Sequence, residues 1–216
     1  MNDKVLEKLS YGLFICTAKD GNKDNGCIIN TVMQVTVNPM RIMVAVNKSN
    51  YTHDMIMNTR KCNISVISQD ADFELFKHFG FQSGKDVDKF DPASGTWMKE
   101  NKDYCVRTPN EVMCITKGTN AHISLWVEDT VDLGTHTLFI CVVVDGDILN
   151  SVPSATYEYY HANIKKPLNN PSANTEGKKV WRCKICGFEY VGDELPEDYI
   201  CPLCKHPASD FELVEK

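Results

Sequence analysis

The sequence predicts a mainly β protein with some α-helix, organised as a closed β-barrel with helical additions and a small metal-bound domain after it. Three observations support this. Many short apolar runs of strand length are separated by turn residues between Leu13 and Asp147, a pattern typical of barrels. A segment rich in Pro, Asn, Ser, Gly and Lys follows at 162–178 and lacks apolar periodicity. Two C-x2-C pairs then fall within residues 179–216, and such pairs bind metal ions.

The composition excludes several classes of partner. The 216 residues carry a net charge of −6, which argues against a nucleic-acid surface or an anionic membrane as partner. The N-terminal residues MNDKVLEKLS lack the apolar core of a signal peptide. The longest apolar run, Leu138–Val144, is much shorter than a membrane-spanning helix. We therefore expect a cytoplasmic protein.

The barrel domain is predicted over residues 1–161, the linker over 162–178 and the metal domain over 179–216. Strands are expected at 13–18, 27–37, 41–46, 62–67, 112–116, 121–127 and 137–144, and helices at 3–10, 51–59 and 71–79. The glycine- and charge-rich stretch 80–103 is expected to be a functional loop. Six cysteines outside the C-x2-C pairs are expected to be buried as small apolar side chains: Cys16, Cys27, Cys62, Cys105, Cys114 and Cys141.

The last domain depends on its metal. Cys183 and Cys186 form one C-x2-C pair, and Cys201 and Cys204 form the other. Two facing pairs of this spacing make a tetrahedral thiolate cage that suits zinc or iron. So short a segment cannot bury enough apolar surface to fold alone, whereas a metal site contributes on the order of 10–16 kcal/mol. Disulfides are a weaker alternative in a cytoplasmic protein.

The residues around these cysteines resemble rubredoxin. The matching pattern is W-x-C-x-x-C-G-F-x-Y, then C-P-x-C, then D-F-E, with Lys205 where rubredoxins usually carry glycine. Rubredoxins hold one iron, Fe3+ or Fe2+, in four thiolates and carry single electrons. The resemblance implies iron as the bound metal, with zinc as the alternative.

Polar residues cluster where the expected strand 41–46 leads into the expected helix 51–59. The segment reads Asn47-Lys48-Ser49-Asn50-x-Thr52-His53. Cationic, hydroxyl and amide donors at such a turn can hold a phosphate, and the alternative is a solvated loop with a helix cap. There is no G-x-G-x-x-G fingerprint, so a dinucleotide site of the Rossmann type is not supported.

Three segments of the first domain, 11–53, 79–90 and 132–146, resemble the flavin reductase-like family. That resemblance implies an FMN-binding split β-barrel that is usually a homodimer. Residues implied to contact the isoalloxazine ring are Asn30, Thr31, Val32 and Gln34. Those implied to contact the ribityl chain and phosphate are Asn47, Lys48, Asn50 and Thr52, and those implied to close over the cofactor are Ser83 and Lys89. His136 would lie near the reactive face as the catalytic residue, or alternatively is an ordinary turn residue.

The order of the two domains resembles the high-molecular-weight rubredoxins. That resemblance implies an electron carrier that takes electrons from NAD(P)H, directly or through an NADH:rubredoxin reductase, and passes them through FMN and iron to a flavodiiron-type reductase of O2 or NO. Two alternatives stay open. One is an NAD(P)H:flavin reductase that acts on free or bound FMN. The other is a zinc-stabilised FMN-binding module without electron transfer.

Overall fold

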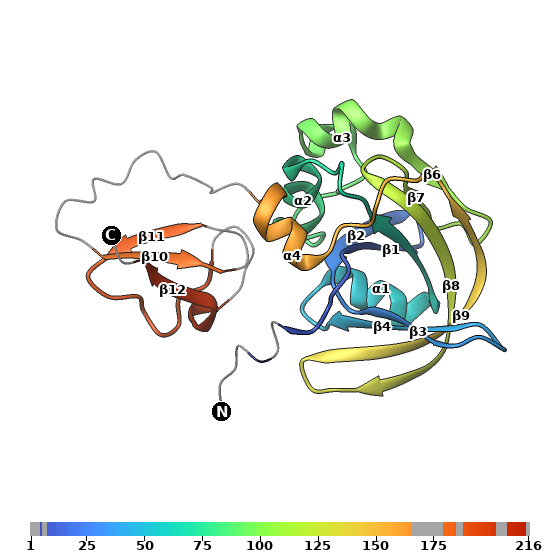
Figure 1. Cartoon of the computed structure of the whole chain (residues 1–216), viewed down its shortest axis with the longest axis horizontal. Helices are drawn as coiled ribbons and strands as arrows, with labels where there is room; N and C mark the ends of the chain where they lie inside the picture. Colours follow the sequence, from blue (N-terminus) through green and yellow to red (C-terminus); the bar gives the residue numbers. More distant parts are fainter. Residues whose placement is uncertain (1–4, 6–7, 166–178, 185–187, 202–206, 215–216) are drawn as a thin grey trace. The chain divides into compact units, whose positions relative to one another are not determined.

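The chain consists of two compact units, Met1–Ile164 and Lys165–Lys216 (Figure 1). The structure is a computed structural model that describes residues 5, 8–165, 179–184, 188–201 and 207–214. The first unit ends in α4 (Tyr157–Tyr159) and a π-helical turn, η4 (Tyr160–Ile164). Because Ile164 is buried, the first residues of the expected linker belong to the barrel unit. Residues 166–178 lie outside the described residues, as do residues 3, 4, 6 and 7 of the helix expected over 3–10.

A seven-stranded antiparallel sheet forms the first unit. The strands are β1 (Phe14–Asp20), β2 (Lys23–Ile29), β3 (Val32–Thr36), β4 (Arg41–Asn47), β5 (Lys61–Ile67), β8 (Thr119–Asp132) and β9 (His136–Ile148). Their order is β2-β1-β5-β8-β9-β4-β3, and each neighbouring pair is antiparallel. The sheet curls around an apolar interior, and its edge strands are β2 and β3 (Figure 1). The expected mainly β architecture is confirmed.

The prediction of a single strand over 27–37 was wrong. Ile29 ends β2, Asn30 and Thr31 lie outside both strands, and Val32 begins β3. The two strands are consecutive in the chain but form opposite edges of the sheet. The continuous β-rich composition concealed this break, because Thr31 and Val32 suit a strand as well as their neighbours do.

Two helices lie where the apolar spacing predicts them, α1 (Tyr51–Thr59) and α2 (Phe73–Gly80). The three phenylalanines expected in the core, Phe73, Phe76 and Phe79, are all buried. The stretch expected to be a loop over 80–103 also contains short helical turns: η2 (Pro92–Ser94), α3 (Thr96–Asn101) and the start of η3 (Lys102–Tyr104). No helix in the described part of the chain is both long and apolar enough to cross a membrane.

The core of the first unit is aliphatic and unusually rich in thiols. Cys16, Cys27, Cys62 and Cys141 lie among Ile, Val, Leu and Phe side chains of one buried cluster. Cys114 is buried elsewhere in the unit, and Cys105 is only partly buried. The prediction that these cysteines act as small apolar side chains is confirmed for five of the six, and Cys105 is the exception.

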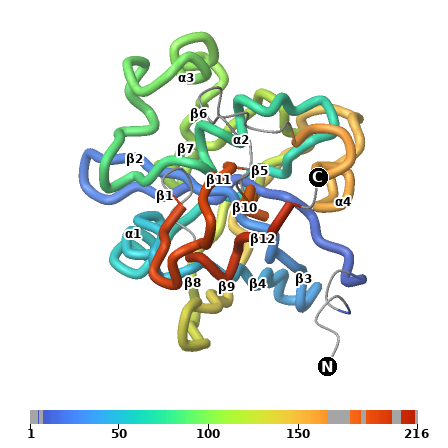
Figure 2. Tube along the Cα trace, turned by 90° about the vertical axis from the view of Figure 1, so that its left-hand side faces the viewer, coloured from blue at the N-terminus to red at the C-terminus, as the bar shows by residue number. Residues whose placement is uncertain are grey.

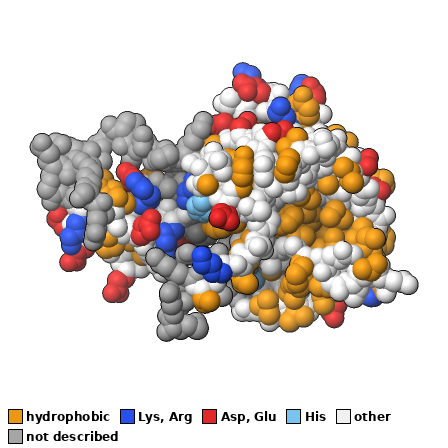
Figure 3. Space-filling model, viewed as in Figure 1, with side chains coloured by type: hydrophobic (Ala, Val, Ile, Leu, Met, Phe, Trp, Pro, Cys, Tyr) orange, Lys and Arg blue, Asp and Glu red, His pale blue; other side chains and the backbone are white. Residues whose placement is uncertain are grey.

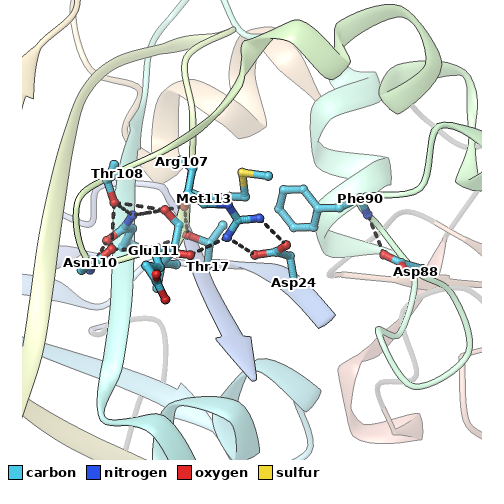
Figure 4. Close-up of polar contacts among 11 residues, drawn as sticks. Thr17, Asp24, Asp88, Phe90, Arg107, Thr108, Asn110, Glu111 and Met113 are labelled. Carbon is cyan, nitrogen blue, oxygen red and sulfur yellow. Dashed lines mark hydrogen bonds and ion pairs between the residues drawn. The ribbon is translucent and has the colours of Figure 1, made fainter. Parts of the chain in front are cut away.

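A short hairpin is fastened to the outside of the sheet by a buried polar network. It consists of β6 (Cys105–Arg107) and β7 (Met113–Ile115). Asn63 of β5 donates through Nδ2 to Thr108 Oγ1 at 2.7 Å and accepts through Oδ1 from Asn110 Nδ2 at 2.7 Å. Arg107 pairs with Asp24 of β2 at 2.8 Å, as Figure 4 shows. Buried polar groups that are satisfied in this way specify one arrangement of the hairpin.

The second unit is a small three-stranded sheet. Its strands are β10 (Lys179–Cys183), β11 (Glu189–Gly192) and β12 (Phe211–Val214), in the order β11-β10-β12. A 3-10 turn, η5 (Ala208–Asp210), precedes β12. The ring of Tyr199 lies 4.7 Å from that of Tyr190 and 5.4 Å from that of Phe211. These ring contacts join the segment before Cys201 to β11 and β12.

The buried thiols predict a loss of stability at alkaline pH. Burial raises the pKa of Cys27 and Cys114, and it raises the pKa of Cys105 to about 12, from an ordinary value of 9.0. Above pH 9 the unfolded chain therefore releases protons that the folded chain retains, so the free energy of unfolding falls as pH rises. Lys89, whose pKa burial lowers to about 8, acts in the opposite direction, but the thiols outnumber it.

We expect a net loss of about 1–2 kcal/mol between pH 9 and 10. Guanidinium unfolding under reducing conditions at a series of pH values measures it. Cys105→Ala should have a shallower dependence than the parent chain. A free energy of unfolding that stays constant or rises over this interval would contradict the prediction.

Candidate functional site

The turn between β4 and α1 carries the polar cluster that the sequence singles out. Asn47 Oδ1 accepts a hydrogen bond from the Ser49 backbone N–H at 2.9 Å, and the Asn50 N–H donates to the Asn47 carbonyl at 3.0 Å. Asn50 is the N-cap of α1, but its side chain makes no capping bond. The His53 N–H donates to the Asn50 carbonyl at 3.0 Å, and the N–H groups before it in the first turn are not capped by the Asn50 side chain and can bind an anion.

The turn between β8 and β9 lies beside this cluster. Asn47 is directly opposite His136 in the pairing of β4 with β9. The Lys48 N–H donates to the Thr135 carbonyl at 3.0 Å, and Lys48 Nζ lies 2.6 Å from Asp132 Oδ1. Figures 1 and 2 show this hairpin end, in yellow, projecting past α1. The structure therefore brings together Asn47, Lys48 and His136, although the last is far away in the sequence.

His53, to which the sequence assigns no role, joins α1 to β9 beneath these turns. It is buried, with Nε2 2.9 Å from Thr137 Oγ1 and Nδ1 3.0 Å from Asp54 Oδ1. Since a carboxylate only accepts, Nδ1 carries the hydrogen, and in the neutral ring Nε2 accepts from the Thr137 hydroxyl. His136 itself is partly exposed, and its Nδ1 lies 2.9 Å from Thr135 Oγ1. The sequence feature that could have identified His53 was its position one residue after Thr52, in the first turn of α1.

The first turn of α1 is also linked to the loop that follows α2. Thr52 is fully buried and accepts a hydrogen bond from Asn25 Nδ2 at 3.0 Å. Asn25 lies so close to Gly84 that an added Cβ there would come within 2.3 Å of Asn25 Oδ1. Lys23 Nζ donates to the Gly84 carbonyl at 2.7 Å. Thr52 in α1 and Gly84, which follows Ser83 in the loop, therefore both contact strand β2. Ser83 is partly buried, and its Oγ accepts from the Lys85 N–H at 3.1 Å.

Lys89 anchors the same loop to the edge strand β2 and to α2. Its side chain is 2% exposed, and Nζ donates to the carbonyls of Gly26 at 2.7 Å and Phe79 at 2.8 Å. Burial lowers the pKa of this amine to about 8. The Lys89 carbonyl in turn lies 2.7 Å from His78 Nε2. In this arrangement the ammonium holds the loop to β2 and α2, which favours an anchoring role over contact with a phosphate.

The residues expected at the isoalloxazine ring occupy the connection between β2 and β3 and the edge strand itself. Asn30, Thr31 and Val32 are partly buried, while Gln34 is exposed. Thr31 Oγ1 donates to Asn30 Oδ1 at 3.0 Å, and the Thr31 carbonyl accepts from the Ala45 N–H at 3.1 Å. These contacts hold the connection against β4 at Ala45, two residues before Asn47.

The candidate metal site is described for one cysteine of each C-x2-C pair. Cys183 at the end of β10 and Cys201 are both fully buried, whereas Cys186 and Cys204 lie outside the described residues. The Cys183 N–H donates to the Phe188 carbonyl at 2.8 Å, and the Lys184 N–H donates to the Asp210 carbonyl at 2.7 Å. Buried thiolates on a backbone tied in this way suit a tetrahedral metal ion. The described residues alone contain no group of three or more metal ligands.

Comparison with known proteins identifies both units. Residues 6–167 match the Flavin reductase like domain. The chain belongs to the flavin reductase-like family. Residues 181–212 match the rubredoxin-like domain of rubrerythrin. The flavin reductase-like barrel is therefore followed by a rubredoxin-like domain.

Two curated relatives cover most of the chain. It is 33% identical to the high molecular weight rubredoxin of Moorella thermoacetica, over 99% of this chain and 100% of that protein. It is 34% identical to a ferric-chelate reductase (NAD(P)H) of Archaeoglobus fulgidus, over 74% of this chain and 89% of that protein. The first relative has a length that accommodates both domains, and the second matches the barrel.

Solved structures share the fold of the barrel. The NADH:FAD oxidoreductase of Streptomyces globisporus aligns with a TM-score of 0.55 at 20% identity, over 67% of this chain and 80% of that one. Flavoredoxin from Methanosarcina acetivorans aligns with a TM-score of 0.54 at 20% identity, over 64% and 69%. At this identity the likeness shows the fold alone.

The anchoring role of Lys89 can be tested by substitution. Lys89→Met keeps an unbranched apolar chain but leaves the Gly26 and Phe79 carbonyls without their donor. We expect a loss of about 1–3 kcal/mol in the free energy of unfolding and faster hydrogen exchange of the loop. Lys85→Met, an exposed position in the same loop, is the control. Equal exchange in the two variants would show that Lys89 does not anchor the loop.

Proposed function

We propose that this protein carries electrons from an NAD(P)H-linked donor to a flavodiiron-type reductase of O2 or NO. FMN on the barrel and one iron bound by Cys183, Cys186, Cys201 and Cys204 would carry the electrons in turn. The observation that carries the proposal is the fusion of a flavin reductase-like barrel and a rubredoxin-like domain in one chain, matched over 99% of its length by a high molecular weight rubredoxin. FMN exchanges electrons in pairs or singly and iron singly, so the two groups suit transfer in sequence.

The FMN site is proposed where the two turns meet. The phosphate would lie against Lys48, Asn50 and the start of α1, since a cation and an uncapped helix N-terminus favour an anion there. The isoalloxazine ring would lie along the segment from Asn30 to Gln34, with His136 close to the reactive face. The register of Asn47 opposite His136 supports one site. The bonds of Thr52 and Lys89 within the barrel favour supporting roles, with Ser83 at the loop surface.

The barrel is proposed to form a homodimer through its edge strand β3. Met33, Val35 and Met40 are exposed large apolar side chains at this edge, and Figure 3 shows hydrophobic side chains gathered on the side of the barrel where β3, β4, β8 and β9 lie. An exposed apolar edge strand favours pairing with another chain. A second copy of this chain is the partner that the family fold suggests.

The homodimer is tested by a charge at the edge. Met33, which is 54% exposed, is replaced in Met33→Glu, because a buried carboxylate without a partner opposes association. We expect light scattering to give the mass of a dimer for the parent chain and of a monomer for the variant. Met57→Glu, at an exposed position on α1 that is 41% exposed, is the control and should remain dimeric. A monomeric parent chain would exclude this assembly.

A second function is favoured by the ferric-chelate reductase relative. It covers the barrel at 34% identity, so the barrel by itself could transfer electrons from NAD(P)H to a ferric chelate or to free flavin. In that case, turnover would not need the rubredoxin-like domain. A zinc-bound domain without electron transfer is the remaining alternative. A visible spectrum separates the zinc-bound form from the iron-bound carrier, because flavin bands together with ferric-thiolate absorption support the carrier.

The order of electron flow tests the proposed function. After rapid mixing with a reductant or reductase, the flavin bands should bleach before the ferric-thiolate band. Cys201→Ser should lose iron and the fold of residues 179–214, because the metal supplies most of that domain's stability. It should still accept electrons at FMN but fail to pass them to a downstream acceptor. Cys105→Ser, in the barrel, is the matched control and should behave as the parent chain.

Two results would contradict this order. If the iron of FMN-free protein is reduced at the full rate, the flavin does not lie on the electron-transfer path. If Cys201→Ser reduces the acceptor as fast as the parent chain, the barrel acts alone, as the ferric-chelate and flavin reductase alternatives predict.

A further inference from the structure

The only cation in the segment 47–54 already has an anionic partner. Lys48 Nζ lies 2.6 Å from Asp132 Oδ1, and the two side chains are 37% and 72% exposed. The carboxylate within the segment itself, Asp54, is hydrogen-bonded to His53. Asp132 therefore already accepts a hydrogen bond from the ammonium to which the proposed flavin site assigns the phosphate.

The carboxylate of Asp132 is held in place by the turn that follows it. Its Oδ1 also accepts from the Gly134 N–H at 2.8 Å. The Leu133 N–H donates to the His136 carbonyl at 2.9 Å, and Gly134 has a φ of +79°, a conformation that favours glycine. The bonds from Lys48 and Gly134 hold the pKa of Asp132 below its ordinary value. Asp132 thus presents a fixed negative charge at this position.

We propose that Asp132 is a specificity-determining residue that competes with the ligand's phosphate for Lys48 and lowers the affinity for FMN relative to riboflavin, which has no phosphate. This inference rests on the proposed function, because it requires a flavin phosphate at Lys48. The reacting groups of the flavin are not involved.

The opposite role, in which Asp132 improves binding by orienting Lys48, is the weaker effect. An exposed ion pair such as that of Lys48 with Asp132 orients the ammonium only weakly, and losing this orientation would lower the affinity for FMN by a factor of about one to five. A carboxylate about 6 Å from a dianionic phosphate costs roughly tenfold in affinity in water, and salt at about 0.15 M screens this to about threefold. Removing Asp132 also frees the ammonium. Freeing the ammonium and losing its orientation involve the same weak ion pair and offset each other. The relief of repulsion therefore decides the sign, and a neutral residue at position 132 should tighten FMN binding.

The test titrates the full-length flavin-free protein with FMN and with riboflavin, following flavin fluorescence. Asp132→Asn keeps an oxygen for the Gly134 N–H and removes the charge. We expect it to bind FMN about two- to fivefold more tightly, with riboflavin unchanged and with a smaller gain at high salt. Asp132→Ser is a second neutral variant if the first does not fold. Glu74→Gln removes a carboxylate from another exposed pair, with Lys77 at 2.7 Å, and should change neither affinity.

Lys48→Ala separates this inference from the proposed function. The variant should weaken FMN binding roughly ten- to a hundredfold and leave riboflavin binding unchanged. If it does so but Asp132→Asn leaves FMN affinity unchanged or weakens it, the competition is overturned and the phosphate site stands. Equal tightening of FMN and riboflavin also overturns the proposal. If the parent chain binds neither flavin, the proposed function and the inference fail together.

Discussion

The pairing of β4 with β9 is the interaction on which the candidate site depends. It places Asn47 opposite His136 and Val46 opposite Thr137, so that two turns far apart in the sequence lie together at one end of these neighbouring strands. Each turn is then held to the other through the Lys48 N–H and the Thr135 carbonyl. A one-residue slip in this register would turn every side chain of β9 to the other face. The buried Phe139 and Cys141 of β9 oppose such a slip, because it would expose them.

Buried polar side chains do the remaining positioning around the site. His53 connects α1 to β9, Asn25 connects β2 to α1, and Lys89 connects the loop after α2 to the edge strand β2. Each of these groups is costly to bury unless its partners are in place. They therefore favour one arrangement of α1 and the loop over others of equal apolar burial. Lys89 is the clearest case, since both of its bonds go to backbone carbonyls that have fixed positions.

The two domains reach stability by different means. The barrel buries a continuous aliphatic and thiol-rich cluster, which provides a driving force proportional to its apolar area. The described residues of the rubredoxin-like domain form three short strands with a few aromatic contacts, and a unit of that size would depend on a bound metal for most of its stability. This division has a functional consequence under the proposed scheme, because loss of the metal would remove the second redox group without disturbing the first.

Local pattern in the sequence determined the elements and the metal motif. The apolar runs at 13–18, 41–46 and 62–67 correspond to β1, β4 and β5, and the spacing of Phe73, Phe76 and Phe79 corresponds to one buried face of α2. Burial has a period of two in strands and 3.6 in helices, so neighbouring residues carry this information. The spacing of the C-x2-C pairs is equally local, and it identified the second domain.

Only the tertiary structure decided which side chains meet. The break at Asn30, the burial of Lys89 and the role of His53 all depend on partners in other strands. The pairing of Lys48 with Asp132 joins residues 84 positions apart. Such contacts follow from the order and register of the strands, which are determined by many weak interactions along the whole chain. A short segment of sequence therefore does not contain enough information to predict them. The sequence therefore identified the polar cluster after β4, and the fold decided that a carboxylate from the β8–β9 turn would lie against its only cation.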